Sequence, residues 1–404
     1  MADGKTALCL LLFLIAACSS GTGASGESST SPIFNDLTGV ACPSVSLCFA
    51  VGQTFISGAS GDEGYRTLIE RWDGRSWSVV ESPDSGDGQS HIARVSCASS
   101  SLCFAVGYDG PYLHTHVLIE RWNGSSWSLV TAPSIANSIN SVLRDVSCPA
   151  TSLCFAVGQY FPTGGDIQGL IERWNGGSWT VMPDLHLGFL YATGCKSVTF
   201  CLATGVDYTF ERGKQVTLNL TELWNGTAWK VVPTGPAEGQ SPIDTISCTD
   251  TIRCVGSAAA YGAQPGGGPM IETWDGSSWH VAQTPHPPVP AGPAQVVDRL
   301  QSVTCLSALF CLAAGWHMRN TTQRSNVDTL AELWDGTAWK IVPSPNGTTT
   351  AGHDANNGLA AIACHDSSHC LAVGHYSPRG VFQTLAEQWN GTAWSIVPSA
   401  NRSV

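Results

Sequence analysis

Apolar and polar residues alternate in short runs along most of the chain, and this period of two is typical of β-strands. The stretch from Leu37 to Pro83 contains four such runs: LTGVAC, CFAVG, LIERW and a run that starts at Trp77. An Asp-Gly dipeptide follows Trp72, and this is a strong hairpin signal. A proline at the end of the fourth run suits an outer edge strand, because it blocks further pairing. The pattern therefore predicts four antiparallel strands.

The same arrangement occurs seven times, in copies that begin near residues 37, 92, 143, 190, 243, 300 and 359. Self-similarity at a period of roughly fifty residues, with four short strands per copy, is typical of propeller blades. The sequence therefore predicts an all-β fold, a seven-bladed β-propeller with four antiparallel strands per blade. The repeats leave no room for a second domain, so residues 34–404 are assigned to the propeller.

Fourteen of the sixteen cysteines form seven pairs, each with five residues between the partners. The pairs are Cys42 and Cys48, Cys97 and Cys103, Cys148 and Cys154, Cys195 and Cys201, Cys248 and Cys254, Cys305 and Cys311, and Cys364 and Cys370. Each pair flanks the predicted turn between the first and second strands, so we expect one disulfide in each blade. Zinc binding is the rival interpretation. The spacing is not that of zinc ligands, and free thiols would oxidise outside the cell.

The two remaining cysteines lie in an apolar N-terminal segment. Its apolar run, residues 7–17, is too short to span a bilayer as a permanent helix. It ends in Ile-Ala-Ala-Cys18, which resembles a bacterial lipobox, whose cysteine is lipidated and becomes the new N-terminus. We therefore expect a lipoprotein signal peptide over residues 1–18 and a Ser/Gly/Thr-rich tether over residues 19–33.

The alternative is ordinary cleavage near Ala24, which would release a freely secreted protein. Both interpretations place the domain outside the reducing compartment. The lipoprotein interpretation gives a protein at the surface of a bacterial cell that contacts the membrane only through its N-terminal lipid anchor.

The order of elements in each copy resembles the kelch-type propellers: a hairpin that ends in glycine, an aromatic residue that closes the third strand, a turn, and a tryptophan that opens the fourth. The fragment from Asp73 to Trp77 also resembles the Asp-box hairpin of sialidase-type propellers. Two features depart from the kelch pattern. A single glycine stands where kelch repeats carry a Gly-Gly doublet, and the cysteine pairs are not a kelch feature. The resemblance therefore implies the fold and no particular activity.

The net charge of −12 argues against a nucleic-acid partner, because phosphates require a basic surface. A glutamate recurs in the third strand of all seven copies, as at Glu70, and we expect it to be a structural hydrogen-bond acceptor. We find no catalytic fingerprint, phosphate loop or dinucleotide motif. The sequence therefore predicts no cofactor, no metal site and no identifiable catalytic residue. We expect a monomer.

Loop lengths indicate which end of the propeller carries function. The turn between strands one and two and the turn between strands three and four have constant length, whereas the other two loops are long and variable. Alternate connections lie at opposite ends of an antiparallel blade, so one face has short turns and the other has long loops. We call these the short-turn face and the long-loop face. Binding residues are common on variable loops, so the long-loop face is the candidate functional surface.

Every copy carries an aromatic residue where the second strand reaches the long-loop face, and two histidines lie beside the last two of these residues. The candidate ligand-binding residues are Phe55, Tyr108, Tyr160, Tyr208, Tyr261, Trp316, His317, His375 and Tyr376. Such rings can stack on a sugar or a peptide, or they can simply cover the end of the core.

The sequence thus favours a membrane-tethered module that binds an extracellular glycan or protein. The alternative is an extracellular carbohydrate-active enzyme, a lyase or hydrolase, that uses acidic and histidine residues of the same face.

Overall fold

A computed structural model gives the structure of the propeller. It describes residues 34–56, 64–83, 89–111, 113–135, 137–182, 187–211, 214–232, 242–258, 270–287, 295–320, 325–348, 356–378 and 381–401. All strands belong to one compact unit, Pro32–Val404. The expected signal peptide, the tether and Tyr261 lie outside the described residues.

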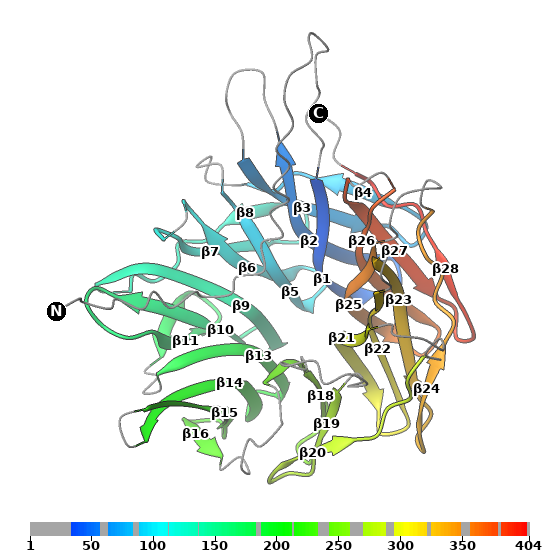
Figure 1. Ribbon diagram of the computed structural model, residues 1–404. Coiled ribbons are helices and arrows are strands. Elements are labelled where there is room, and N and C mark those ends of the chain that lie inside the picture. The colour runs from blue at the N-terminus through cyan, green and yellow to red at the C-terminus, as the bar shows by residue number, and fades with distance from the viewer. Residues whose placement is uncertain are drawn as a thin grey trace, which may run out of the picture. The chain divides into compact units, whose positions relative to one another are not determined.

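Seven antiparallel sheets of four consecutive strands make up this unit (Figure 1). The first strands are β1 (Phe34–Ser44), β5 (His91–Ser99), β9 (Ser138–Ala150), β13 (Gly188–Ser197), β17 (Ile243–Asp250), β21 (Gln295–Ser307) and β25 (Asn357–Asp366). The second strands are β2 (Leu47–Ile56), β6 (Leu102–Asp109), β10 (Leu153–Pro162), β14 (Phe200–Glu211), β18 (Arg253–Ala258), β22 (Phe310–Asn320) and β26 (His369–Tyr376). The third strands are β3 (Gly64–Trp72), β7 (His116–Trp122), β11 (Gln168–Trp174), β15 (Lys214–Trp224), β19 (Met270–Trp274), β23 (Ser325–Trp334) and β27 (Gln383–Trp389). The fourth strands are β4 (Trp77–Val80), β8 (Trp127–Leu129), β12 (Trp179–Met182), β16 (Trp229–Val232), β20 (Trp279–Ala282), β24 (Trp339–Val342) and β28 (Trp394–Ile396).

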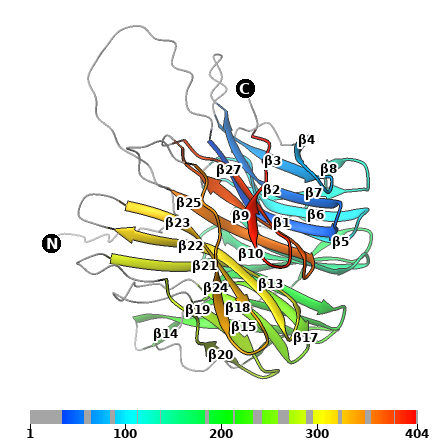
Figure 2. The same cartoon turned by 90° about the vertical axis from the view of Figure 1, so that its right-hand side faces the viewer.

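The first strands form the inner ring of the propeller. Each contacts the first strand of the next blade, from β1 and β5 through to β21 and β25, and β25 contacts β1 (Figures 1 and 2). The ring is therefore closed, and no strand is exchanged between the first and last blades. The predicted seven-bladed propeller is confirmed, and we number the blades 1 to 7 in chain order.

All seven predicted disulfides are present, one per blade. Each joins the first and second strands across their turn, with Cα atoms 3.9 to 4.1 Å apart. The first strand was expected to end at its cysteine, but β1 continues to Ser44 before the turn. The disulfide therefore links two paired strands near the short-turn face.

Aromatic side chains pack neighbouring blades together. Phe49 of blade 1 lies with its ring centroid 4.8 Å from Trp122 and 5.0 Å from Trp127, both of blade 2. Leu371 of blade 7 packs in one buried cluster with the tryptophan pair of blade 1. The contact that closes the ring thus resembles the contacts between consecutive blades, which explains why no swapped strand is needed.

The turn between the third and fourth strands has the same construction in each blade. Its glycine has a positive φ, for example +97° at Gly74, and only glycine adopts this conformation readily. The preceding side chain accepts backbone hydrogen bonds: Asn123 Oδ1 accepts from Ser125 N at 2.9 Å and from Ser126 N at 3.0 Å. The Asn-Gly-Ser/Thr triplets therefore have a structural explanation as turns.

The repeated glutamate is buried between blades, and in blades 1, 2 and 7 it accepts a hydrogen bond from the preceding blade. Neither oxygen of Glu172 or of Glu332 has a hydrogen-bond partner among the described residues. Ser82 Oγ donates to Glu120 Oε1 at 2.9 Å, and Ser344 Oγ donates to Glu387 Oε2 at 2.9 Å. The same bond closes the ring, because Ser399 Oγ donates to Glu70 Oε2 at 2.8 Å. Burial raises the pKa of Glu70 to about 7 and that of Glu387 to about 8. The predicted role as a structural acceptor fits these contacts.

Candidate functional site

The six described aromatic residues of the candidate set lie between blades. Alternation along the second strand decides which neighbour each ring meets. Trp316 lies on the same face of β22 as Leu312 and Ala314, which pack against blade 7. Tyr160 lies on the same face of β10 as Cys154 and Ala156, which pack against blade 2. The aromatic residue is five or seven positions after the cysteine in some blades and six in others, so the rings divide between two faces of the sheets.

Most of these rings are half-buried against protein partners. Phe55 contacts Tyr65 with centroids 5.2 Å apart, and Tyr208 contacts Phe189 at 5.6 Å. The hydroxyl of Tyr376 donates to Gln383 Oε1 at 2.9 Å, and that of Tyr160 donates to the equivalent Gln168. These contacts give the rings a role in packing the blade ends.

Each first strand contains a β-bulge at the same position, and the residue that it leaves unpaired differs from blade to blade. In blade 1 the register shifts between Leu37 and Gly39, and in blade 3 Leu143 and Asp145 pair with consecutive residues. The bulge residues are Thr38, Ala93, Arg144, Tyr191, Asp244, Gln301 and Ala360. Bulges often redirect side chains near functional sites. This inner ring is therefore where the sevenfold symmetry of the repeats is lost.

Charged side chains of the first strands interact across the ring. Arg299 Nη2 of blade 6 donates to Asp244 Oδ2 of blade 5 at 2.8 Å. Burial raises the pKa of Asp244, while Arg299, and more weakly Arg94 and Arg144 of blades 2 and 3, lower it. Side chains from four blades thus share one electrostatic environment.

Arg94 and Arg144 are held by neutral partners as well as by charge. Arg94 Nη1 donates to the carbonyl oxygen of Thr38. Arg144 Nε donates to Gln159 Oε1 at 2.6 Å, and its guanidinium lies 5.4 Å from the centroid of Tyr191. Both cations therefore have fixed positions on the inner ring of first strands, which surrounds the propeller axis; we call the axis the channel.

His91, at the start of β5, lies beside this cluster. Its ring is 5.2 Å from that of Tyr108, and Gln53 Oε1 is 3.0 Å from its Nδ1. Burial lowers the pKa of His91 to about 4, which Asp36 opposes and Arg94 and Arg144 reinforce. His91 is therefore neutral at pH 7.

His375 and Trp316, two of the predicted candidate residues, complete an arc around the channel. Asp36 Oδ1 lies 3.0 Å from His375 Nδ1, so Asp36 links His375 of blade 7 to His91 of blade 2. Gly358 lies between the rings of His375 and Trp316, because a Cβ atom there would be 3.6 Å from His375 Cε1 and 3.7 Å from Trp316 Cδ1. We call Trp316, His375, Asp36, His91, Tyr108, Arg94 and Arg144 the channel arc.

His317 belongs to a separate cluster on the other face of its strand. Its Nδ1 bonds to the buried carboxylate of Asp298, and His286 Nδ1 lies 3.8 Å from the second oxygen of that carboxylate. Alternation places His317 toward blade 5 and Trp316 toward blade 7. The structure thus separates two adjacent residues that the sequence grouped together.

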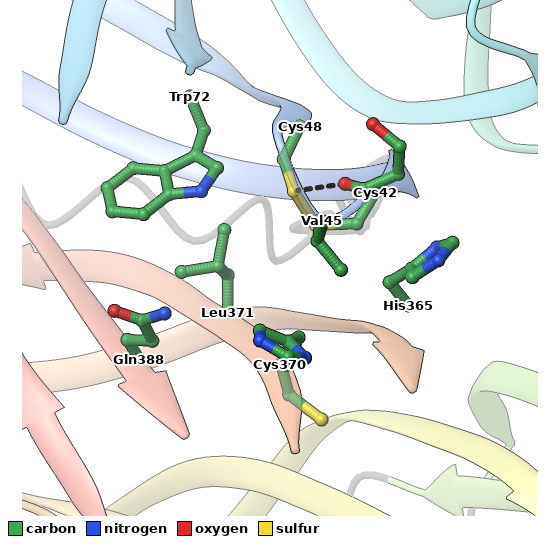
Figure 3. A pocket seen from close by; sticks show the side chains of 10 residues that line it. Cys42, Val45, Cys48, Trp72, His365, Cys370, Leu371 and Gln388 are labelled. Carbon is green, nitrogen blue, oxygen red and sulfur yellow. Dashed lines mark hydrogen bonds between the residues drawn. A yellow bond between two sulfur atoms is a disulfide. The ribbon is translucent and has the colours of Figure 1, made fainter. Parts of the chain in front are cut away.

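At the short-turn face, a small cleft lies between blades 7 and 1 (Figure 3). Val45, Trp72, His365 and Leu371 are among its lining residues. Within the described ranges, no group of three or more His, Cys, Asp or Glu residues is arranged to hold a metal. None of the described segments forms a helix that could cross a membrane.

The sequence interpretation missed Asp36, His91, Arg94, Arg144 and the Asp244–Arg299 pair. A signal was present, because the first strands read LTGVAC, IARVSC, LRDVSC, LYATGC, IDTISC, LQSVTC and LAAIAC. The first residue is always leucine or isoleucine and the last is always cysteine, whereas the second and third positions vary widely among the blades, with alanine occurring twice at each. Variable positions inside a repeated buried strand indicate a site as clearly as variable loops do.

No family model matches the chain, and no curated protein matches it. Solved structures of propellers are similar to it. One is a GH74 xyloglucanase from Xanthomonas campestris, with a TM-score of 0.54 at 14% identity over 88% of this chain and 52% of that one. The chain thus spans about half the length of that enzyme. Another is the propeller domain of the Trilobed protease from Pyrococcus furiosus, with a TM-score of 0.52 at 9% identity over 91% and 97%. A PL25 ulvan lyase has a TM-score of 0.50 at 7% identity over 87% and 92%. At these identities the likeness shows the propeller fold alone.

Proposed function

We propose that this protein is an exported binding module whose ligand docks over the long-loop end of the channel, on the channel arc. Seven disulfides indicate an oxidising, extracellular location. The observation that carries the proposal is the arc itself. It gathers charged and aromatic residues at positions where the blades differ, although scaffold requirements are the same in every blade.

The chemistry of the arc favours an acidic glycan as the ligand. Arg94 and Arg144 present guanidinium groups, which pair with carboxylates or sulfates. Tyr108 and Trp316 supply aromatic faces that can stack on sugar rings. A protein partner with an acidic segment is the other outcome that binding experiments can reveal.

Glycan-array binding by residues 32–404 tests this function. We expect binding to acidic glycans, and we expect Arg144→Gln and Trp316→Ala each to weaken it about tenfold, the cost of one charge-assisted bond or one stacked ring. Arg71→Gln is the matched control, because Arg71 is exposed on the third strand of blade 1, away from the arc. Wild-type affinity in both arc variants would remove the arc from the binding site.

The second candidate function is catalysis on an extracellular carbohydrate, by a lyase or hydrolase. One observation favours it: neutral His91 lies beside Tyr108 and close to two arginines. Such a group can accept a proton next to a carboxylate that the arginines bind. A xyloglucanase and an ulvan lyase share the propeller fold, which is compatible with this candidate. Incubation with acidic polysaccharides, followed by assays for unsaturated uronates and new reducing ends, tests it. We expect His91→Gln to abolish any turnover, and absence of turnover in the wild type would exclude the candidate.

The proposal also includes a lipid anchor at Cys18, a tether over residues 19–33, a monomeric state and a kelch-type or Asp-box-like ancestry. The Asx turn at Asp73, which accepts from Ser76 N at 2.8 Å, supports the Asp-box likeness. Metabolic labelling with a fatty-acid analogue tests the anchor. Label in the wild type that is lost in Cys18→Ser would support it, and an unlabelled secreted protein would favour cleavage near Ala24.

A further inference from the structure

Most exposed aliphatic side chains fall into two groups; Leu113, Ile139 and Leu218 belong to neither. The first group occurs once in the fourth strand of every blade: Val79, Leu129, Val181, Val231, Val281, Ile341 and Ile396. Because this position is repeated around the ring, we regard it as scaffold. The second group lies in or beside the turns between first and second strands, on the short-turn face, and does not occur in every blade: Val45, Val198, Ile252, Leu306 and Leu309. Leu306 is the penultimate residue of β21, and the other four lie in the turns.

Ile252 and Leu309 occupy a position that does not require an apolar residue. It lies four residues after the first cysteine, beside the glycine of the neighbouring turn. The other five blades have serine or threonine there: Ser46, Ser101, Ser152, Thr199 and Ser368. Ile252 is 63% exposed and Leu309 is 68% exposed, the highest values among the described large apolar residues. Packing inside the blade therefore does not explain these two side chains.

The apolar tips are concentrated on consecutive blades. Val198 belongs to blade 4, Ile252 to blade 5, and Leu306 and Leu309 to blade 6. The first strands of these blades, β13, β17 and β21, are neighbours in the ring. The corresponding tips of blades 2, 3 and 7 are Ser-Ser, Thr-Ser and Ser-Ser. The sector formed by blades 4 to 6 thus carries four of the five exposed aliphatic residues of this face, and Val45 of blade 1 is the fifth.

The same sector carries cations, although the chain has a net charge of −12. Lys196 is two residues from Val198, Arg253 is next to Ile252, and Lys230 is the second residue of the outer strand of blade 4; all three are exposed. The aspartates of the sector are engaged in their own turns. Asp250 Oδ1 accepts from Ile252 N at 2.9 Å, Asp275 accepts from Ser277 N and Ser278 N, and Asp335 pairs with Lys340.

We propose that the short-turn face of blades 4 to 6 docks on an anionic lipid surface, which adds a second membrane contact to the expected lipid anchor. Ile252 and Leu309 enter the boundary between headgroups and acyl chains, and Lys196 and Arg253 contact lipid phosphates. Apolar area combined with nearby basic residues is the chemistry of interfacial membrane binding. A specific protein interface needs about 800 Å² per partner. A few separate turn tips offer much less, whereas they suit insertion into a fluid surface.

The expected tether permits this orientation. Residues 19–33 would span roughly 50 Å when fully extended. The chain enters β1 at the long-loop end of blade 1, so in the docked orientation the tether would run from that end to the membrane. Docking would then hold the long-loop face away from the membrane and toward extracellular ligands.

Co-sedimentation of residues 32–404 with vesicles tests the proposal, because this unit contains the whole closed ring. We expect binding to vesicles of mixed phosphatidylglycerol and phosphatidylcholine, and weaker binding to pure phosphatidylcholine. The variant Ile252→Ser with Leu309→Ser should bind at least about tenfold more weakly, because it removes two insertable side chains. Serine stands at this position in four other blades, so we expect the variant to fold. Thermal melting would verify this.

The matched control is Val231→Ser with Val281→Ser, which removes two exposed aliphatic residues, 48% and 53% exposed, from the scaffold position. It should bind vesicles like the wild type. Lys196→Ala with Arg253→Ala should remove most of the preference for anionic lipid. Equal vesicle binding by the Ile252/Leu309 variant and the wild type would overturn the proposal. So would concentration-dependent dimerisation, lost in that variant, without vesicle binding.

Discussion

Replacement of Glu172 by glutamine should make the propeller more stable at alkaline pH. Glu172, in β11, is fully buried, and neither carboxylate oxygen has a hydrogen-bond partner among the described residues. Burial raises the pKa of its carboxyl from 4.5 to about 8. A buried carboxylate without partners is costly, so the folded protein keeps this group protonated.

The direction in which stability changes with pH follows from the proton that the chain takes up on folding. Between pH 4.5 and about 8 the unfolded chain has lost this proton while the folded chain still holds it. Folding therefore takes up a proton, and stability falls as the pH rises through this window. Each pH unit costs about 1.4 kcal/mol, so between about pH 5 and pH 8 the loss from Glu172 is about 3 to 4 kcal/mol. Glutamine has nearly the same shape and does not titrate, so Glu172→Gln should lack this loss.

Urea unfolding followed by tryptophan fluorescence, at about pH 5 and about pH 8, measures the effect. We expect wild type and variant to differ little at the lower pH and the variant to be more stable at the higher pH. Glu81→Gln removes a negative charge from an exposed position and serves as the control. Parallel stability curves for wild type and Glu172→Gln would show that the folded protein does not hold this proton, and the argument from burial would be wrong.

Three further predictions concern the scaffold. Ser399→Ala removes a donor to Glu70 at the ring closure and should lower the free energy of unfolding by about 1 kcal/mol; an unchanged urea midpoint would contradict this. Cys148→Ala with Cys154→Ala opens one disulfide loop and should cost about 2 kcal/mol in the same assay, whereas equal stability would contradict the loop-entropy argument. Gly107→Ala places a Cβ atom against a backbone carbonyl of the inner strand, so we expect a clearly lower melting temperature; wild-type melting would mean that the strands can separate without cost.

The sequence was sufficient for the architecture because its signals are local. Alternation gives the strands, Asp-Gly after Trp72 gives the turn, and the spacing of Cys42 and Cys48 gives a hairpin disulfide. Each signal spans only a few residues and recurs in every blade. Sevenfold repetition then converts a local prediction into a closed ring.

The channel arc could not be predicted in this way, because it depends on which strands meet after the ring closes. His375 and Asp36 are separated by almost the whole chain, yet they lie 3.0 Å apart. The aromatic set shows a second limit. One residue more or less after the cysteine moves a ring to the other face of its sheet, so Trp316 and Tyr160 meet different neighbours although both follow the same motif.

Comparison of the blades with one another separates scaffold from function. Equivalent positions in seven blades experience nearly the same packing, so the most frequent residue shows what packing requires. Serine beside the turn glycine, as at Ser101, is sufficient for the fold, and Ile252 and Leu309 are therefore additions that the fold does not need. The same logic applies to Arg144 and Asp244 in the bulge, where Ala93 and Ala360 are sufficient elsewhere. The channel arc and the apolar residues Ile252 and Leu309 lie toward opposite ends of the blades. A ligand site and a membrane-docking site can therefore operate together without competing for the same surface.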